Sequence, residues 1–190
     1  YNGGNAGVQE GQATTTGYML FKRFNRSISK TSPGVASQNR PSIIFRLADF
    51  YLIYAEVANE VNPSDSRVLT YLNLVRERAG LPKVEVLNPG IVGNKELQRA
   101  AIQRERQIEL ATEGQRYFDV RRWMIADKDG EGRQNGYAHG MNVRGTINDT
   151  EEFNRVVETE KIVFNRKMYL QPIPDHEMRK TQNLVQNPGW

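Results

Sequence analysis

The chain has 190 residues, with 26 Lys and Arg against 22 Asp and Glu, and no cysteine. This length suits one domain, or a domain with an irregular appendage. The lack of cysteine excludes a disulfide framework or a thiolate metal site. No apolar run approaches the roughly 20 residues of a transmembrane helix. The net charge of +4 does not indicate nucleic-acid binding, because arginines alternate with glutamates and a phosphate-binding face needs cations without interspersed carboxylates.

Residues 1–42 predict an irregular, extended lead-in. Residues 1–16 are mostly Gly, Asn, Gln, Thr and Ala without periodicity, a composition that cannot bury a core. Residues 18–21 are a short apolar run that suits an extended segment, and residues 25–42 hold the Ser, Thr, Asn, Pro and Gly typical of a surface loop. We therefore expect the packed part of the molecule to begin at residue 43.

Residues 43–61 predict a helix that is apolar on most sides. Its main apolar stripe has helical spacing and consists of Ile43, Leu47, Phe50, Tyr54, Ala58 and Val61. A second stripe beside it contains Ile44, Ala48, Tyr51 and Ala55. One narrow polar stripe remains, made of Arg46, Asp49, Glu56 and Glu60. We expect such a helix to lie inside an array of helices, with earlier helical units covering its outer face.

Three further helices are predicted up to residue 126. The first spans residues 66–79 and ends at Gly80, a residue favoured just after a helix C-terminus. The second runs from the N-cap candidate Asn94 to residue 114, and the third spans residues 117–125. One face of the second contains Leu97, Ala101, Arg104, Ile108 and Ala111. Residues 83–93 are expected to form a loop, and the short connections predict antiparallel helix pairs.

The remaining residues, 127–190, predict a loop-rich part of the same domain. We expect a long loop at 127–150, a short helix at 151–157, and short extended runs at 161–165 and 167–170. Asp175 is a candidate cap for a last helical turn. The sequence thus predicts a mainly α fold, in which tetratricopeptide-like helix-turn-helix pairs at 43–126 are combined with long irregular loops and a few short strands.

No catalytic constellation emerges from the sequence. The two histidines, His139 and His176, fall in separate predicted loops. Carboxylates at Glu105, Glu109 and Glu113 repeat every four residues, with partners such as Arg106 and Arg116 nearby, a pattern typical of ion-paired helix faces. A glycoside hydrolase would need two facing carboxylates in a cleft, and nothing in the spacing indicates them. We therefore expect a protein that is not an enzyme.

A candidate metal site lies at Asp127, Asp129 and Glu131. Alternating carboxylates followed by Gly132 resemble the first half of a Ca²⁺-binding loop. The twelfth position of that loop, however, is Ala138, where a bidentate glutamate is needed. A solvated acidic turn is the favoured alternative, and no other cofactor is expected.

A candidate ligand site lies in the glycine-rich part of the same loop, at Tyr137, His139 and Asn142. An aromatic ring provides a platform for the C–H face of a sugar, and imidazole and amide groups provide partners for its hydroxyls. The alternative is a surface loop whose composition has no binding role.

Four stretches resemble, in chain order, the RagB/SusD family. They are residues 45–56, 71–82, 104–123, and 169–174 together with 186–190. The resemblance implies the C-terminal third of a non-catalytic lipoprotein on the extracellular face of the outer membrane of Bacteroidetes-type bacteria. The main aromatic ligand platform would then lie upstream of residue 1. A lipid anchor would also lie upstream, and it would be the protein's one attachment to the membrane.

The family resemblance also implies two partners. One is a SusC-like TonB-dependent transporter, and the other is an oligosaccharide or polysaccharide, or in some members a peptide, captured for nutrient uptake. The alternative interpretation is a helical-repeat scaffold that binds other proteins and no glycan.

Overall fold

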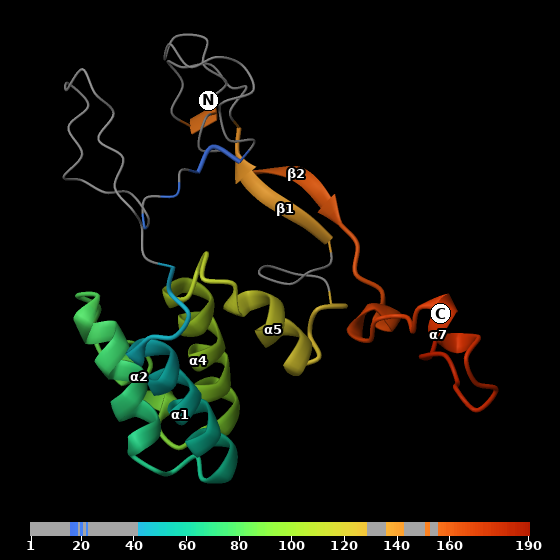
Figure 1. Cartoon of the computed structure of the whole chain (residues 1–190). Helices are drawn as coiled ribbons and strands as arrows, with labels where there is room; N and C mark the ends of the chain where they lie inside the picture. The colour runs from blue at the N-terminus through green and yellow to red at the C-terminus, as the bar shows by residue number, and fades with distance from the viewer. Residues whose placement is uncertain are drawn as a thin grey trace, which may run out of the picture. The chain divides into compact units, whose positions relative to one another are not determined.

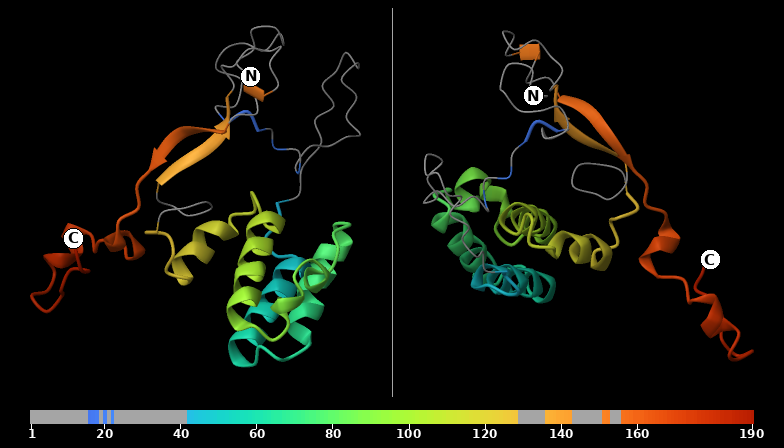
Figure 2. Two further views of the ribbon diagram at one scale, coloured as in Figure 1. Left: turned by 180° about the vertical axis from the view of Figure 1, so that it is seen from behind. Right: turned by 45° about the horizontal axis from the view of Figure 1, so that its top comes forward.

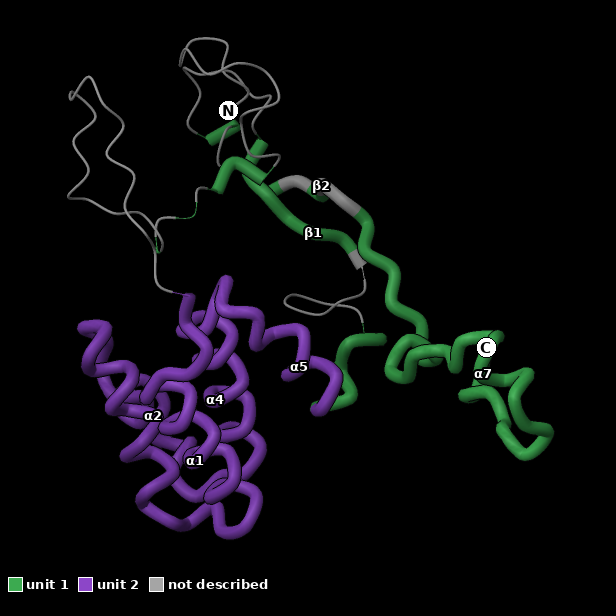
Figure 3. Tube along the Cα trace, viewed as in Figure 1, with its two compact units in different colours: residues 1–39, 123–190 green, residues 40–122 purple. Residues whose placement is uncertain are grey.

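The computed structural model (Figures 1 and 2) describes residues 16–18, 20, 22, 42–128, 136–142, 151–152 and 156–190. The chain divides into two compact units (Figure 3). One comprises residues 40–122, and the other comprises residues 1–39 and 123–190. The first unit spans nearly the same residues as the expected helix pairs at 43–126.

Three helices lie side by side in the unit 40–122: α1 (Leu47–Val61), α2 (Arg67–Arg78) and α4 (Lys95–Glu109) (Figure 1). The short helix α3 (Val84–Leu87) and the 3₁₀ turn η1 (Pro89–Ile91) connect α2 to α4, and α5 (Gln115–Arg122) follows. The buried core of this unit consists of Leu52, Ala55, Val68, Leu72, Val75 and Ile102. The described residues confirm a mainly α fold, and none of their helices is long and apolar enough to cross a membrane.

Local signals position two of the helix ends. The Asn94 side chain accepts a hydrogen bond of 3.1 Å from the backbone N–H of Leu97, which confirms Asn94 as the N-cap of α4. After α2, Gly80 has a φ of 77°. The N–H groups of Gly80 and Leu81 donate to the carbonyls of Glu77 and Arg76, which closes the helix in a Schellman motif. The prediction of Gly80 as the residue after the helix is therefore confirmed.

Other boundaries differ from the expected ones. The first helix begins at Leu47 rather than residue 43, because Arg46 has extended backbone with a φ of −149°. The helix α4 ends at Glu109 rather than residue 114, and Thr112 and Gly114 beyond it have positive φ values of 68° and 83°. The expected loop at 83–93 contains α3 and η1, and α5 begins at Gln115 rather than residue 117.

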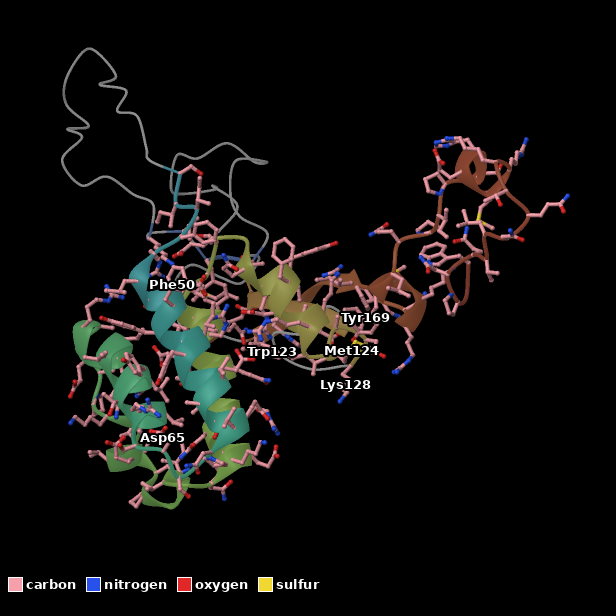
Figure 4. The ribbon with its side chains drawn as sticks, turned by 60° about the horizontal axis from the view of Figure 1, so that its bottom comes forward. Phe50, Asp65, Trp123, Met124, Lys128 and Tyr169 are labelled. Atoms are coloured by element: carbon pink, nitrogen blue, oxygen red, sulfur yellow. The ribbon has the colours of Figure 1, made fainter. Side chains whose placement is uncertain are left out.

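The faces that α1 and α4 bury are not their most apolar faces. In α1 the buried residues are Asp49, Leu52, Ala55 and Asn59. Most of the main apolar stripe is exposed instead, including Phe50, which is labelled in Figure 4. In α4 the buried residues are Gln98, Ile102, Glu105 and Arg106, whereas Leu97 and Ile108 are exposed. Polar side chains can be buried here because they bond to side chains or carbonyls of neighbouring elements.

The second unit contains an antiparallel hairpin of β1 (Gly136–Met141) and β2 (Val156–Ile162). The strand β1 lies in the expected loop at 127–150, and Val156 and Val157 are in β2 rather than in a helix. β-Branched residues favour such a paired strand. The expected extended run at 167–170 is mostly the 3₁₀ helix η2 (Arg166–Tyr169). The predicted last helical turn is α7 (Asp175–Met178), but Asp175 is its first residue rather than its cap, and Pro174 occupies the N-cap position.

Candidate ligand-binding site on the hairpin

The strand β1 presents Tyr137 and His139 on one face, because alternate residues of a strand point to the same side. Both side chains are exposed, and 48% of Tyr137 is accessible to solvent. Asn142 follows the end of β1 and is half-buried, so strand alternation does not align it with the other two. The structure thus brings two of the three candidate residues together on a regular element.

The opposite strand adds two charged residues to this face. Lys161 pairs with Tyr137, and its Nζ lies 5.7 Å from the centre of the tyrosine ring. Glu158 pairs with His139. An irregularity in the register between Ala138 and His139 leaves an extra residue in β2, which keeps both charged residues on the side of the aromatic ring. Residue type alone did not single out Lys161 and Glu158, since their place depends on the strand register.

We call these four residues the hairpin face: Tyr137, His139, Glu158 and Lys161. It combines a flat aromatic ring with an ammonium and an imidazole that can donate, and with a carboxylate that accepts. A sugar ring can stack its C–H face on the tyrosine while its hydroxyls bond to the charged neighbours. This chemistry suits reversible binding of a polyhydroxylated ligand.

The acidic candidate Asp127 has a structural partner. The hydroxyl of Tyr169 donates to Asp127 Oδ1 at 2.6 Å and accepts from the Asp127 backbone N–H at 3.1 Å. The hydrogen bond from Tyr169 lowers the pKa of Asp127, and burial, followed by that bond, raises the pKa of Tyr169. Asp129 and Glu131 lie outside the described residues, so the Ca²⁺ hypothesis stays a prediction. Within the part of the chain that the structure describes, no three His, Asp or Glu side chains gather as metal ligands would.

A cleft of about 540 Å³ in the same unit was not foreseen from the sequence. Its lining comes from segments far apart in the chain: Met124, Arg166, Lys167, Tyr169, Leu170, Pro188 and Gly189. Figure 4 shows Met124 and Tyr169 close together. The Trp190 indole, which donates to the carbonyls of Lys167 and Leu170 at 3.1 and 3.0 Å, ties the last residue to η2. No periodic pattern marks such a cleft, because it depends on these long-range contacts.

The carboxylates Glu105 and Glu109 of α4 and Glu113 beyond its end are ion-paired, as the sequence predicts, and each has an arginine partner from another segment. Glu109 Oε1 lies 2.6 Å from Arg46 Nη1 and 2.6 Å from Arg78 Nη2. Glu113 Oε2 lies 2.7 Å from Arg46 Nε, and Glu105 Oε2 lies 2.9 Å from Arg76 Nη1. These groups therefore hold helices together.

Arg106, expected to pair with a glutamate of its own helix, is buried between two aspartates. Its Nη1 lies 2.9 Å from Asp49 of α1, and its Nε lies 2.9 Å from Asp119 of α5. Arg122 bonds to the same Asp119 and to Glu56 of α1. The narrow polar stripe of α1 thus faces the charged side chains of α4 and α5 and forms ion pairs with them.

Comparison with known proteins gives a consistent result. The sequence model of the SusD family matches residues 1–190. The chain is 44% identical over 106 residues to SusD-like protein P25 of Formosa agariphila. This alignment covers 56% of this chain and 19% of P25. It is 31% identical over 153 residues to SusD-like protein P2 of the same organism, covering 78% of the chain and 26% of P2.

Among solved structures, the chain is similar to BT4246 in its selenomethionine form, with 34% identity and a TM-score of 0.65, over 80% of this chain and 25% of that one. The chain therefore spans about a quarter or less of the length of these relatives.

Proposed function

The chain belongs to the SusD family, and from this membership we propose that it is part of a non-catalytic protein that binds a glycan. The protein lies on the extracellular face of the outer membrane, held by a lipid anchor. It delivers its ligand to a SusC-like TonB-dependent transporter for uptake. The ligand is an oligosaccharide or polysaccharide, with a peptide as the alternative that the family allows.

The observation that carries glycan binding in this chain is the hairpin face. Tyr137 is exposed on a strand, and Lys161 stands beside its ring. His139 and Glu158 extend the same face by one residue pair. A strand supports such a platform more rigidly than an irregular loop, so less ordering is needed when the sugar binds. Asn142, which follows the strand, is the third predicted contact.

A role without catalysis is supported by how the carboxylates are used. Glu105, Glu109 and Glu113 are each bonded to arginines, and Asp127 is bonded to Tyr169. Glycoside hydrolysis needs an acid and a base or nucleophile facing each other across a sugar. Carboxylates that serve as structural anchors are unsuited to that exchange of protons.

Substitution of Tyr137 tests the proposed site. Tyr137→Ala should weaken glycan binding roughly three- to tenfold, since stacking contributes about 0.5–1.5 kcal/mol. It should leave the melting temperature unchanged, because the side chain is exposed. Tyr137→Phe, which keeps the ring, should retain most of the affinity. A glycan array on the full-length protein would identify the ligand, and calorimetry would then measure the affinities. Equal affinities of Tyr137→Ala and wild type would remove Tyr137 from the site.

A second candidate function is a scaffold that binds proteins only. The exposed apolar residues of α1 favour it, including Phe50, Ile53 and Val57, since apolar patches on a surface mark interaction sites. Saturable binding on the glycan array would support the first function. Capture of the transporter by full-length protein that binds no glycan on the array would support the scaffold.

A further inference from the structure

The cleft of about 540 Å³ beside η2 has two cationic side chains on its wall. Arg166 and Lys167 are the first two residues of η2, and both line the cleft. Tyr169 and Leu170 continue the same wall. The volume falls within the range of sites for small molecules. We call this cavity the η2 cleft.

The two cations of the η2 cleft are not neutralised by short ion pairs. The Arg166 side chain is 80% exposed, and its Nη1 lies 3.6 Å from Asp127 Oδ2, which is beyond hydrogen-bond distance. Asp127 accepts a bond of 2.6 Å from the Tyr169 hydroxyl. The Nζ of Lys167 lies 4.1 Å from the centre of the Trp190 ring and pairs with no carboxylate that the structure describes. The cleft can therefore offer two cationic donors to an anionic ligand.

Close packing by residues 189–190 holds the Lys167 side of the η2 cleft in place. A Cβ atom at Gly189 would lie 2.9 Å from the Lys167 Cβ, and Gly189 has a φ of 87°, so only glycine suits this position. The Trp190 indole donates to the carbonyls of Lys167 and Leu170 at 3.1 and 3.0 Å. A wall that is fixed in advance loses less entropy when a ligand binds.

The other groups of this wall are apolar or already bonded. Met124 and Leu170 are 46% and 51% exposed. Met124 has a left-handed φ of 55°, a conformation that is uncommon for a residue with a side chain and often occurs at ligand sites. The Tyr169 hydroxyl and the carbonyls of Lys167 and Leu170 already take part in hydrogen bonds. The described wall thus offers few acceptors to the hydroxyl groups of a sugar.

We propose that the η2 cleft binds the C-terminal residue of a peptide whose last side chain is apolar. The terminal carboxylate accepts charge-assisted bonds from Arg166 and Lys167, and the side chain packs on Met124 and Leu170. A C-terminal residue carries its carboxylate and its side chain on the same Cα, which suits a wall where cations and apolar groups are neighbours. The cleft shares no residue with the hairpin face, so the proposal does not depend on glycan binding there.

Matched ligands test the η2 cleft in the full-length protein by calorimetry. Acetyl-alanyl-leucine with a free carboxylate is compared with its C-terminal amide, and with acetyl-alanyl-serine, which has the carboxylate but a polar side chain. The leucine acid should bind saturably and roughly tenfold more tightly than its amide, and more tightly than the serine acid. No saturation, or equal affinity of acid and amide, would overturn the proposal. Tighter binding of galacturonic acid than of the leucine acid would assign the cleft to an acidic glycan and refute the peptide site.

Variants of the two cations locate the carboxylate. Lys167→Met removes the ammonium, keeps most of the aliphatic chain, and should weaken binding of the leucine acid roughly tenfold. Arg166→Gln should also weaken binding, and because Arg166 is exposed it keeps the test decisive if Lys167→Met unfolds. Lys180→Met removes the same charge from an exposed lysine that does not line the cleft and should have no effect. Unchanged affinity in both cleft variants would contradict the proposal.

Met124→Gly tests the apolar part of the cleft. Glycine adopts the left-handed backbone without strain, so the melting temperature should not fall, whereas the affinity for the leucine acid should decrease roughly fivefold through lost apolar contact. Affinity equal to that of wild type would show that the leucine side chain does not bind here.

The peptide site and the glycan site can fail separately. Tyr137→Ala alters the hairpin face and should leave the affinity for the leucine acid unchanged. Lost peptide binding in Tyr137→Ala, with full binding in Lys167→Met, would move the carboxylate to the hairpin face and refute the η2 cleft.

Discussion

A guanidinium buried between two aspartates links three helices. The Arg106 side chain is 2% exposed, and Asp49 and Asp119 beside it are 8% and 3% exposed. Moving a charged group out of water costs free energy. A buried ion pair is therefore stable only where each charged group has well-placed hydrogen-bond partners. The two aspartates and the fork of Arg106 meet this condition at distances of 2.9 Å. Hydropathy patterns treat such residues as solvent-facing, and for that reason they do not reveal the buried face of α4.

Glu109→Ala should destabilise the protein without affecting ligand binding. Glu109 is 11% exposed and bonds to Arg46 and Arg78, so its loss removes one of the two carboxylates that bond to the partly buried Arg46 guanidinium and leaves it with Glu113. We expect a decrease of about 1–3 kcal/mol in the free energy of unfolding, measured by chemical denaturation. In the control Glu96→Ala, which breaks an exposed pair, the change should stay below about 0.5 kcal/mol. Unchanged stability with lost ligand binding would instead place Glu109 in a binding site.

Two helix ends, at Asn94 and Gly80, could be predicted from the sequence. Asn94 and Gly80 act through bonds to residues a few positions away, so a short stretch of sequence contains the whole signal. The buried face of α1 depends on which helix provides a partner for Asp49, and that partner is 57 residues away. Sequence spacing identified α1, α2 and α4 as helices, but it could not show which charged residues meet between them.

The hairpin shows the same limit for the candidate site. Tyr137, His139 and Asn142 were selected by residue type. Their region was expected to be a loop, because its glycines weaken a local strand signal. The strand forms because β2 pairs with it, and the segment between the strands is too long for a simple turn signal. Lys161 and Glu158 belong to the face only through this pairing, so sequence analysis missed them.

At the end of α1, Glu60 bonds to Arg99 and Lys95 of α4, at 2.7 and 3.0 Å. The hydrogen bond from Arg99, assisted by Lys95, lowers the pKa of Glu60 from its ordinary 4.5 to about 2. A lowered pKa in the folded state means that this stabilisation is complete above pH 4.5. It is lost as the pH falls through that window to about 2.

The pH dependence of packing between α1 and α4 can therefore be measured. The melting temperature of wild type should fall more steeply than that of Glu60→Gln as the pH is lowered from 4.5 to about 2. Because 42% of the Glu60 side chain is exposed, added salt should reduce the difference. Parallel melting curves for the two proteins across this pH window would show that Glu60 does not link the helices.

At the scale of the whole molecule, the outer side of α1 exposes large apolar side chains to solvent. Phe50, Val57 and Val61 are 56%, 57% and 81% exposed. Produced alone, residues 1–190 should self-associate or bind a hydrophobic dye, because an apolar patch of this kind favours association. Sedimentation and dye fluorescence would measure this. A sharp, monomeric unfolding transition above about 65 °C, beyond the usual range of mesophilic domains, would contradict the prediction.

The ion pair between Arg46, which precedes α1, and Glu113, which follows α4, also has a consequence for the order of folding. Arg46 and Glu113 are separated by 67 positions, whereas α1 and α2 are consecutive and joined by a short turn. During synthesis, α1 and α2 can pair long before residue 113 has been added to the chain. Arg46 therefore has no bond to Glu113 until that later stage. Closing that long loop has an entropic cost that precedes the gain from the contact. A contact that forms after the rate-limiting step of folding slows unfolding more than it speeds folding, and we expect the bond between Arg46 and Glu113 to be of this kind.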